Sequence, residues 1–194
     1  MFSLKEGNLK KTILLLSIIL VISSATLAVS NHVSASNKIA VTIEEVSPFA
    51  YCCIKHKGPY TDMEKIINLL MPTMRSQNIY PQGPMISIYY NSPDEVEPAE
   101  LEWEVGFPVT AQALPQTPLE KKLWEHKLVA VATHVGPYET TGETITSIYE
   151  WMEANNYEQD GPILGKFLSI TSPNATAETA KTEIWIACKK SKTT

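Results

Sequence analysis

The sequence predicts an α+β fold in which a strand–helix–strand–strand unit occurs twice, with both helices on one face of an antiparallel sheet. Three observations support this. The pentads HKGPY (His56–Tyr60) and HVGPY (His134–Tyr138) lie 78 residues apart. The pairs Gly83-Pro84 and Gly161-Pro162 have the same separation. The apolar and polar segments around these landmarks follow one another in the same order. We expect a ligand cleft on the sheet face opposite the helices, because pockets favour the junction between two such units.

The first unit begins with a β-prone run, FAYCCIKHKGPY, that ends in its pentad. Thr61 and Glu64 have the spacing of a helix capping box. A helix is predicted next, because apolar residues recur at three- and four-residue steps: Met63, Ile66, Ile67, Leu70 and Met74. Pro72 is expected to kink this helix or end it early. The segments MISIYYNSP and LEWEVGFPV then predict two strands.

The second unit follows the same plan. LVAVATHVGPY predicts a strand, Thr140 and Glu143 a second capping box, and ILGKFLSITSP and KTEIWIACK the last two strands. The helix between them is indicated by Ile145, Ile148, Tyr149 and Met152. The repeats therefore extend over about residues 41–109 and 127–190. The connector between them is expected to contain a short helical turn at Leu119–Trp124.

Residues 1–35 have the order of a secretory signal peptide: three lysines, the apolar run Ile13–Ile22, and then small residues. We expect export and cleavage, which would leave residues 36–194 as a single domain outside the cell or at its surface. An uncleaved N-terminal membrane anchor is the alternative, and it would be the only contact with a membrane. Loss of the segment removes three lysines and one glutamate, so the net charge falls from −5 to −7.

The acidic charge argues against a nucleic-acid partner, because nucleic-acid-binding domains are typically basic. Cys52, Cys53 and Cys188 match no zinc-binding spacing, so we expect no metal and no cofactor. One disulfide with a leftover thiol is one interpretation of these cysteines, and burial of all three in the core is the other. His56 and His134 are explained by the repeated turn, and no third metal ligand accompanies them.

The two closing strands are informative because side chains alternate between the faces of a strand. Leu101, Trp103 and Val105 belong to the core face of the first, and Ile184 and Ile186 to that of the second.

The opposite faces carry Glu102 and Glu104 on the first closing strand and Glu183 on the second, and Glu104 and Glu183 hold equivalent places. Glu104 has Gly106 as its neighbour on that face, which we expect to leave room, whereas Glu183 has Trp185. A carboxylate beside a large aromatic ring is suited to a cationic or flat aromatic ligand. Partial burial would raise the pKa of such a carboxyl, which makes it a candidate general acid or base.

The two His-x-Gly-Pro-Tyr turns, GPMISIYYNSP and the closing TEIWIA together resemble the GyrI-like small-molecule-binding domain. This domain is also the effector-binding domain of AraC-type and multidrug-responding transcription regulators. The resemblance covers about Val41 to Lys189. No helix-turn-helix accompanies it, so we do not expect a regulator.

The resemblance implies that Glu183 is the central polar group of an aromatic-lined pocket. Trp185 and either Tyr89 or Tyr90 would line this pocket. Glu104, Tyr60 and Tyr138 are further candidates, although turn packing alone would account for the two pentad tyrosines.

Three functions follow. The first is binding of amphipathic aromatic or cationic small molecules, anchored by Glu183. The second is hydrolysis of reactive cyclopropane-type or other electrophilic compounds by Glu183 and Trp185, as the resemblance to stand-alone hydrolases of the family implies. The third is a protein-interaction module at the cell surface. The glutamate–aromatic pairing favours binding, because no second acid or base accompanies it.

Overall fold

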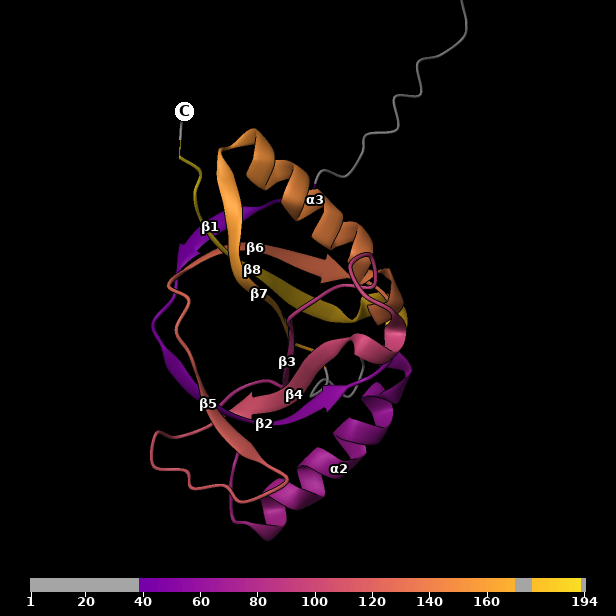
Figure 1. Ribbon diagram of the computed structural model, residues 1–194, viewed down its shortest axis with the longest axis vertical. Helices are drawn as coiled ribbons and strands as arrows, with labels where there is room; N and C mark the ends of the chain where they lie inside the picture. Colours follow the sequence, from indigo (N-terminus) through magenta and orange to yellow (C-terminus); the bar gives the residue numbers. More distant parts are fainter. Residues whose placement is uncertain (1–38, 170–175, 193–194) are drawn as a thin grey trace, which may run out of the picture. The chain divides into compact units, whose positions relative to one another are not determined.

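Eight strands form one antiparallel sheet in the order β1-β6-β8-β7-β3-β4-β2-β5 (Figure 1). The structure, a computed structural model, describes residues 39–169 and 176–192. Its helices are α2 (Met63–Ser76) and α3 (Thr141–Ala154). Its strands are β1 (Thr42–Glu45), β2 (Phe49–Lys57), β3 (Ile86–Tyr89), β4 (Glu102–Pro108), β5 (Glu120–Trp124), β6 (Leu128–Val135), β7 (Tyr157–Phe167) and β8 (Lys181–Lys190). The predicted α+β class is confirmed.

The strand order places counterpart elements of the two predicted repeats in counterpart positions. Strands β2, β4 and β3 on one side of the sheet correspond to β6, β8 and β7 on the other. Strand β1 precedes β2 along the chain but pairs with β6, and β5 precedes β6 but pairs with β2. Each half therefore gives one edge strand to the other half. Duplication of one ancestral unit stays a prediction.

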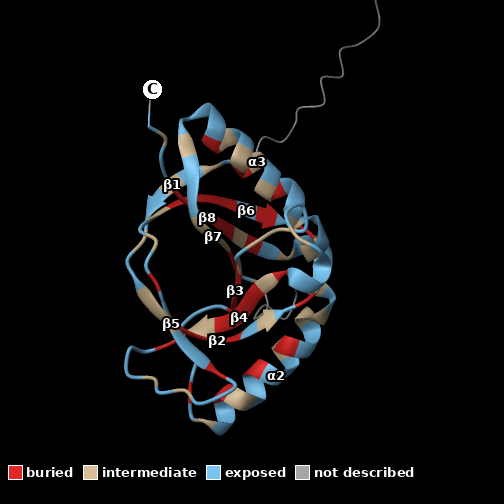
Figure 2. Cartoon of the chain, in the orientation of Figure 1, coloured by how far each residue is buried: buried red, intermediate tan, exposed pale blue. Residues whose placement is uncertain are grey.

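Both helices cover the same face of the sheet (Figure 1). Helix α2 packs on Trp103 and Val105 of β4, and α3 packs on Ile184 and Ile186 of β8. The alternation predicted for both closing strands is therefore confirmed. Figure 2 shows that the helices are buried only on the sides that meet the sheet.

Several local predictions are wrong. Residues predicted as a helical turn in the connector form strand β5, which was not foreseen, and neither was edge strand β1. Strand β7 begins already at Tyr157 and passes through Gly161-Pro162 with an irregularity in its register. Helix α2 continues beyond Pro72 to Ser76. The physical reason is shared: pairing with a neighbouring strand or packing on the sheet outweighs local propensity.

The predicted capping boxes are also wrong. Each pentad leads first into a short 3₁₀ turn, and the helix N-caps Asp62 and Thr140 make no side-chain cap bond. Backbone hydrogen bonds within these turns stabilise the start of each helix instead. They run from the Asp62 N–H to the Pro59 carbonyl and from the Thr140 N–H to the Pro137 carbonyl.

The predicted signal peptide at residues 1–35 lies outside the described residues. Among the helices that the structure describes, none is long and apolar enough to span a membrane. Cys52, Cys53 and Cys188 are buried and free, so the interpretation that all three are core residues is confirmed.

Candidate functional site

The sheet face opposite the helices brings the two halves together through its hydrogen-bond register. Ile88 of β3 lies opposite both Glu104 of β4 and Leu164 of β7, and Leu164 lies opposite Trp185 of β8. Residues directly opposite in a sheet point to the same face. Glu104 and Trp185 therefore share one face, and Glu183, two residues before Trp185, shares it too. We call this the binding face.

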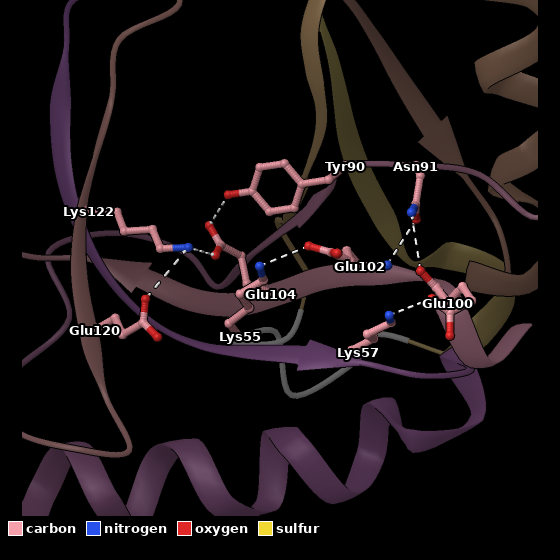
Figure 3. A network of polar contacts seen from close by, with 9 residues as sticks. All are labelled: Lys55, Lys57, Tyr90, Asn91, Glu100, Glu102, Glu104, Glu120 and Lys122. Carbon is pink, nitrogen blue, oxygen red and sulfur yellow. Dashed lines mark hydrogen bonds and ion pairs between the residues drawn. The ribbon is translucent and has the colours of Figure 1, made fainter. Parts of the chain in front are cut away.

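Glu104 is the buried centre of the first half of the binding face, with only 1 % of its surface exposed. Its Oε1 accepts hydrogen bonds from the hydroxyls of Tyr51, at 2.6 Å, and Tyr90, at 2.8 Å. Its Oε2 pairs with the ammonium of Lys122 from edge strand β5 (Figure 3). Two hydroxyl donors and one ammonium thus compensate the cost of burying this carboxylate.

These contacts determine the protonation of the groups around Glu104. Burial, reinforced by the hydrogen bond to Glu104, raises the pKa of Tyr90 to about 12. The same two causes raise the pKa of Tyr51 well above its ordinary value. Burial of the Lys122 ammonium opposes its charge, but the contact with Glu104 is stronger, and the net effect raises the pKa of Lys122. At neutral pH both tyrosines are therefore hydrogen-bond donors and Lys122 is a cation.

Glu183 is the carboxylate of the second half, and its side chain is 27 % exposed. Its Oε1 accepts hydrogen bonds from Lys166 Nζ, at 3.0 Å, and from Trp185 Nε1, at 2.8 Å. Lys166 lies on β7 directly opposite Glu183, and its Nζ is also 3.5 Å from the centroid of the Trp185 ring. The predicted pairing of Glu183 with Trp185 is present, with a lysine added to it.

An aromatic cluster connects the two carboxylates. The centroid of the Phe49 ring lies 6.3 Å from that of Tyr51 and 6.5 Å from that of Trp185. Tyr51 donates a hydrogen bond to Glu104, and Trp185 donates one to Glu183. Trp124 packs against Phe49 and Trp185 at 6.3 Å from each. Glu104 and Glu183, each paired with a lysine, are therefore joined by a largely buried aromatic cluster.

Three predicted lining residues lie elsewhere. Tyr89 lies opposite Trp103 and so belongs to the helix-covered face, where its ring meets that of Tyr60 at 5.3 Å. Tyr138 packs on Phe167, also at 5.3 Å. The structure thus brings Glu104 and Tyr90 together, and Glu183 and Trp185, but separates Tyr60, Tyr89 and Tyr138 from them.

Gly106 does not leave room for a ligand. A Cβ at this position would collide with the carbonyl oxygen of Cys52 and come within 2.8 Å of the Cys53 Cβ. Strand β2, which pairs with β4 here, occupies the space that the sequence analysis assigned to a ligand.

The two pentad histidines have structural partners. His56 Nε2 lies 2.8 Å from Asp62 Oδ2, and His134 Nδ1 lies 2.9 Å from Thr144 Oγ1. Each histidine thereby ties the end of a strand to the start of the following helix. Gly58 and Gly136 follow with φ of 145° and 139°, a region that strongly favours glycine.

Tyr51, Lys122 and Lys166 were not among the predicted site residues. Alternation along β2 and β7 places Tyr51 on the face of Cys53 and Lys166 on the face of Leu164, so these two were accessible to the same argument that found Glu104. Lys122 was not accessible, because β5 was expected to be helical.

A surface pocket of about 340 Å³ lies at the C-terminal end of α2, lined among others by Asn78, Tyr80 and Leu114. It contains none of the predicted site residues. Its lining includes no carboxylate. We therefore assign the candidate site to the binding face.

Comparison with known proteins agrees with the fold. A model of the GyrI-like small molecule binding domain matches residues 39–189. No curated protein matches the chain significantly.

Solved structures are similar at low sequence identity. The EcmrR C-terminal domain is 13 % identical, with a TM-score of 0.70, and the match covers 78 % of this chain and 98 % of that one. A hydrolase from Listeria innocua is 13 % identical, with a TM-score of 0.60 and coverages of 80 % and 95 %. SAV2435, solved bound to tetraphenylphosphonium, is 8 % identical, with a TM-score of 0.50 and coverages of 78 % and 94 %.

Proposed function

Because this chain belongs to the GyrI-like small molecule binding domain family, we propose that it binds amphipathic aromatic or cationic compounds on its binding face, with Glu183 as the polar anchor. The observation that carries the proposal is the aromatic cluster that joins Glu104 to Glu183. A ligand with flat rings would gain dispersion and apolar contact by packing against this cluster, and the partly exposed Glu183 carboxylate would orient its polar end.

Exposure indicates where a ligand would first make contact. Trp124 and Trp185 are almost completely buried, at 2 % and 5 % exposed, whereas Tyr90 is 45 % exposed. Glu183 and Lys166 are also partly exposed. These groups present polar atoms at the edge of the aromatic cluster. A ligand would bind there first and then pack its rings against the cluster. The tetraphenylphosphonium bound to SAV2435 is an aromatic compound of this general kind.

Replacing Glu183 with glutamine is expected to weaken binding at least ~10-fold, because the amide holds Lys166 and the ligand's polar end less strongly; this corresponds to about 1.4 kcal/mol. A thermal-shift screen of aromatic compounds, followed by calorimetric titration of the hits, measures the effect. Glu153→Gln, on the exposed side of α3, is the matched control and should bind like the wild type. Equal affinity of Glu183→Gln and wild type for every hit would contradict the anchor.

Hydrolysis of strained electrophiles is the second candidate, favoured by the position of Glu183 beside Lys166 at a partly exposed site. In this reaction Glu183 takes a proton from water, and the hydroxide attacks a carbon of the strained ring and breaks one of its ring bonds. The proton goes to the atom released, a carbon in a cyclopropane or the oxygen in an epoxide. We expect a product heavier by one water, detectable by mass spectrometry, and at least a ~100-fold lower rate for Glu183→Gln. Unchanged mass across a panel of cyclopropane-containing electrophiles and epoxides would exclude this candidate and leave binding.

A further inference from the structure

Glu104 and Glu183, the two carboxylates next to the aromatic cluster, already have a cation each. Glu104 pairs with Lys122, and Glu183 pairs with Lys166. Each lysine also faces an aromatic ring: Lys122 Nζ is 5.7 Å from the centroid of Tyr90, and Lys166 Nζ is 3.5 Å from that of Trp185. The same arrangement of carboxylate, ammonium and ring therefore occurs in both halves.

Lys166 occupies the place that a cationic ligand would need. A ligand cation would be attracted by the Glu183 carboxylate and by the face of the Trp185 ring. The ammonium of Lys166 makes both interactions at once, at 3.0 Å and 3.5 Å. A cationic ligand would have to displace this ammonium or lie beside it, and like charges at short range repel each other.

Glu104 is not available as an alternative binding partner for a ligand cation. It is 1 % exposed, and Tyr51, Tyr90 and Lys122 all donate to it. The two carboxylates and two ammonium groups balance, so the charge of these four groups sums to zero. Lysine has spare donors, however: an ammonium carries three N–H groups, and Glu183 takes one from Lys166.

We infer that the site selects neutral aromatic compounds that carry a hydrogen-bond acceptor, such as a carbonyl oxygen, over aromatic cations. Lys166 determines this selection by filling the cation position and donating to the acceptor. The inference rests on the proposed binding function and narrows its ligand class to the neutral compounds.

Two probes of nearly identical shape test the inference: triphenylphosphine oxide, which is neutral with a strong acceptor, and methyltriphenylphosphonium, which is a cation. We expect wild-type protein to bind the oxide at least ~10-fold more tightly in calorimetric titrations. Lys166→Met should reverse the preference, because it frees Glu183 and the Trp185 ring for the cation. Lys166→Arg should keep the wild-type preference. Lys189→Met removes the same charge at an exposed pair with Asp160 and should change nothing.

The possible outcomes distinguish failure of the selectivity inference from failure of the proposed binding function. Equal or tighter binding of the cation by wild type overturns the inference but supports the proposed function. An unchanged preference in Lys166→Met, with a folded protein by circular dichroism, overturns the role of Lys166. If neither probe binds any folded variant and the wider aromatic screen is also empty, the proposed function fails, and the inference fails with it.

Discussion

Glu104→Ala is expected to destabilise the protein by about 3–5 kcal/mol, the largest effect of any single polar substitution on the binding face. Removing one member of a buried ion pair leaves its partner as an uncompensated charge, which costs this much in other proteins. Lys122, which is 28 % exposed, would keep only the more distant carboxylate of Glu120, at 3.8 Å, and the hydroxyls of Tyr51 and Tyr90 would lose their common acceptor. Equilibrium unfolding in urea measures the free energy of unfolding.

Glu102→Ala is the matched control for this prediction. Glu102 lies two residues earlier on the same strand and pairs with Lys55 at 2.8 Å, but both side chains are exposed, at 39 % and 45 % (Figure 3). Exposed pairs contribute about 0–1 kcal/mol. A cost for Glu104→Ala as small as that for Glu102→Ala would show that the Glu104 network does not stabilise the fold.

Gly106→Ala is the second substitution with a large expected effect, a loss of about 1–3 kcal/mol or more in the free energy of unfolding. The added methyl group would meet the backbone of Cys52 and the Cβ of Cys53, so strands β2 and β4 would have to separate locally. Rigid backbone cannot yield as a flexible side chain can. Urea unfolding and soluble yield measure the outcome.

Gly142→Ala serves as the comparison, because nothing lies within 4 Å of a Cβ at that position in α3. Alanine is favoured over glycine in a helix, so stability should stay equal or rise by up to about 1 kcal/mol. If the two substitutions had the same effect, the close approach of β2 at Gly106 would not be the reason for glycine there.

The sequence-based predictions were most accurate for the faces of single strands and helices. Alternation along β4 and β8 correctly assigned Trp103 and Ile184 to the helix side and Glu104 and Glu183 to the other. The helical spacing of Ile66, Leu70 and Met74 correctly identified the buried side of α2. Such patterns are local consequences of a two- or 3.6-residue period, so they can be seen in the sequence itself.

The pattern failed where an element depends on a distant partner. Strand β5 has only five residues, four of them not buried, and it forms because β2, about 70 residues earlier, offers an edge for pairing. Strand β1 has four residues and pairs with β6 of the other half. Short edge strands carry too few apolar residues for periodicity to distinguish them from turns.

The candidate site shows the same division. From its own residues the sequence determined that glutamates of both closing strands face away from the core, with Glu183 beside Trp185, and that two similar units follow each other. Only the tertiary structure decided which groups meet those glutamates. Lys122 reaches Glu104 from the far edge strand, and Lys166 reaches Glu183 across the β7–β8 ladder. The electrostatic character of the site depends on these pairings between strands, and no periodicity within one strand encodes them.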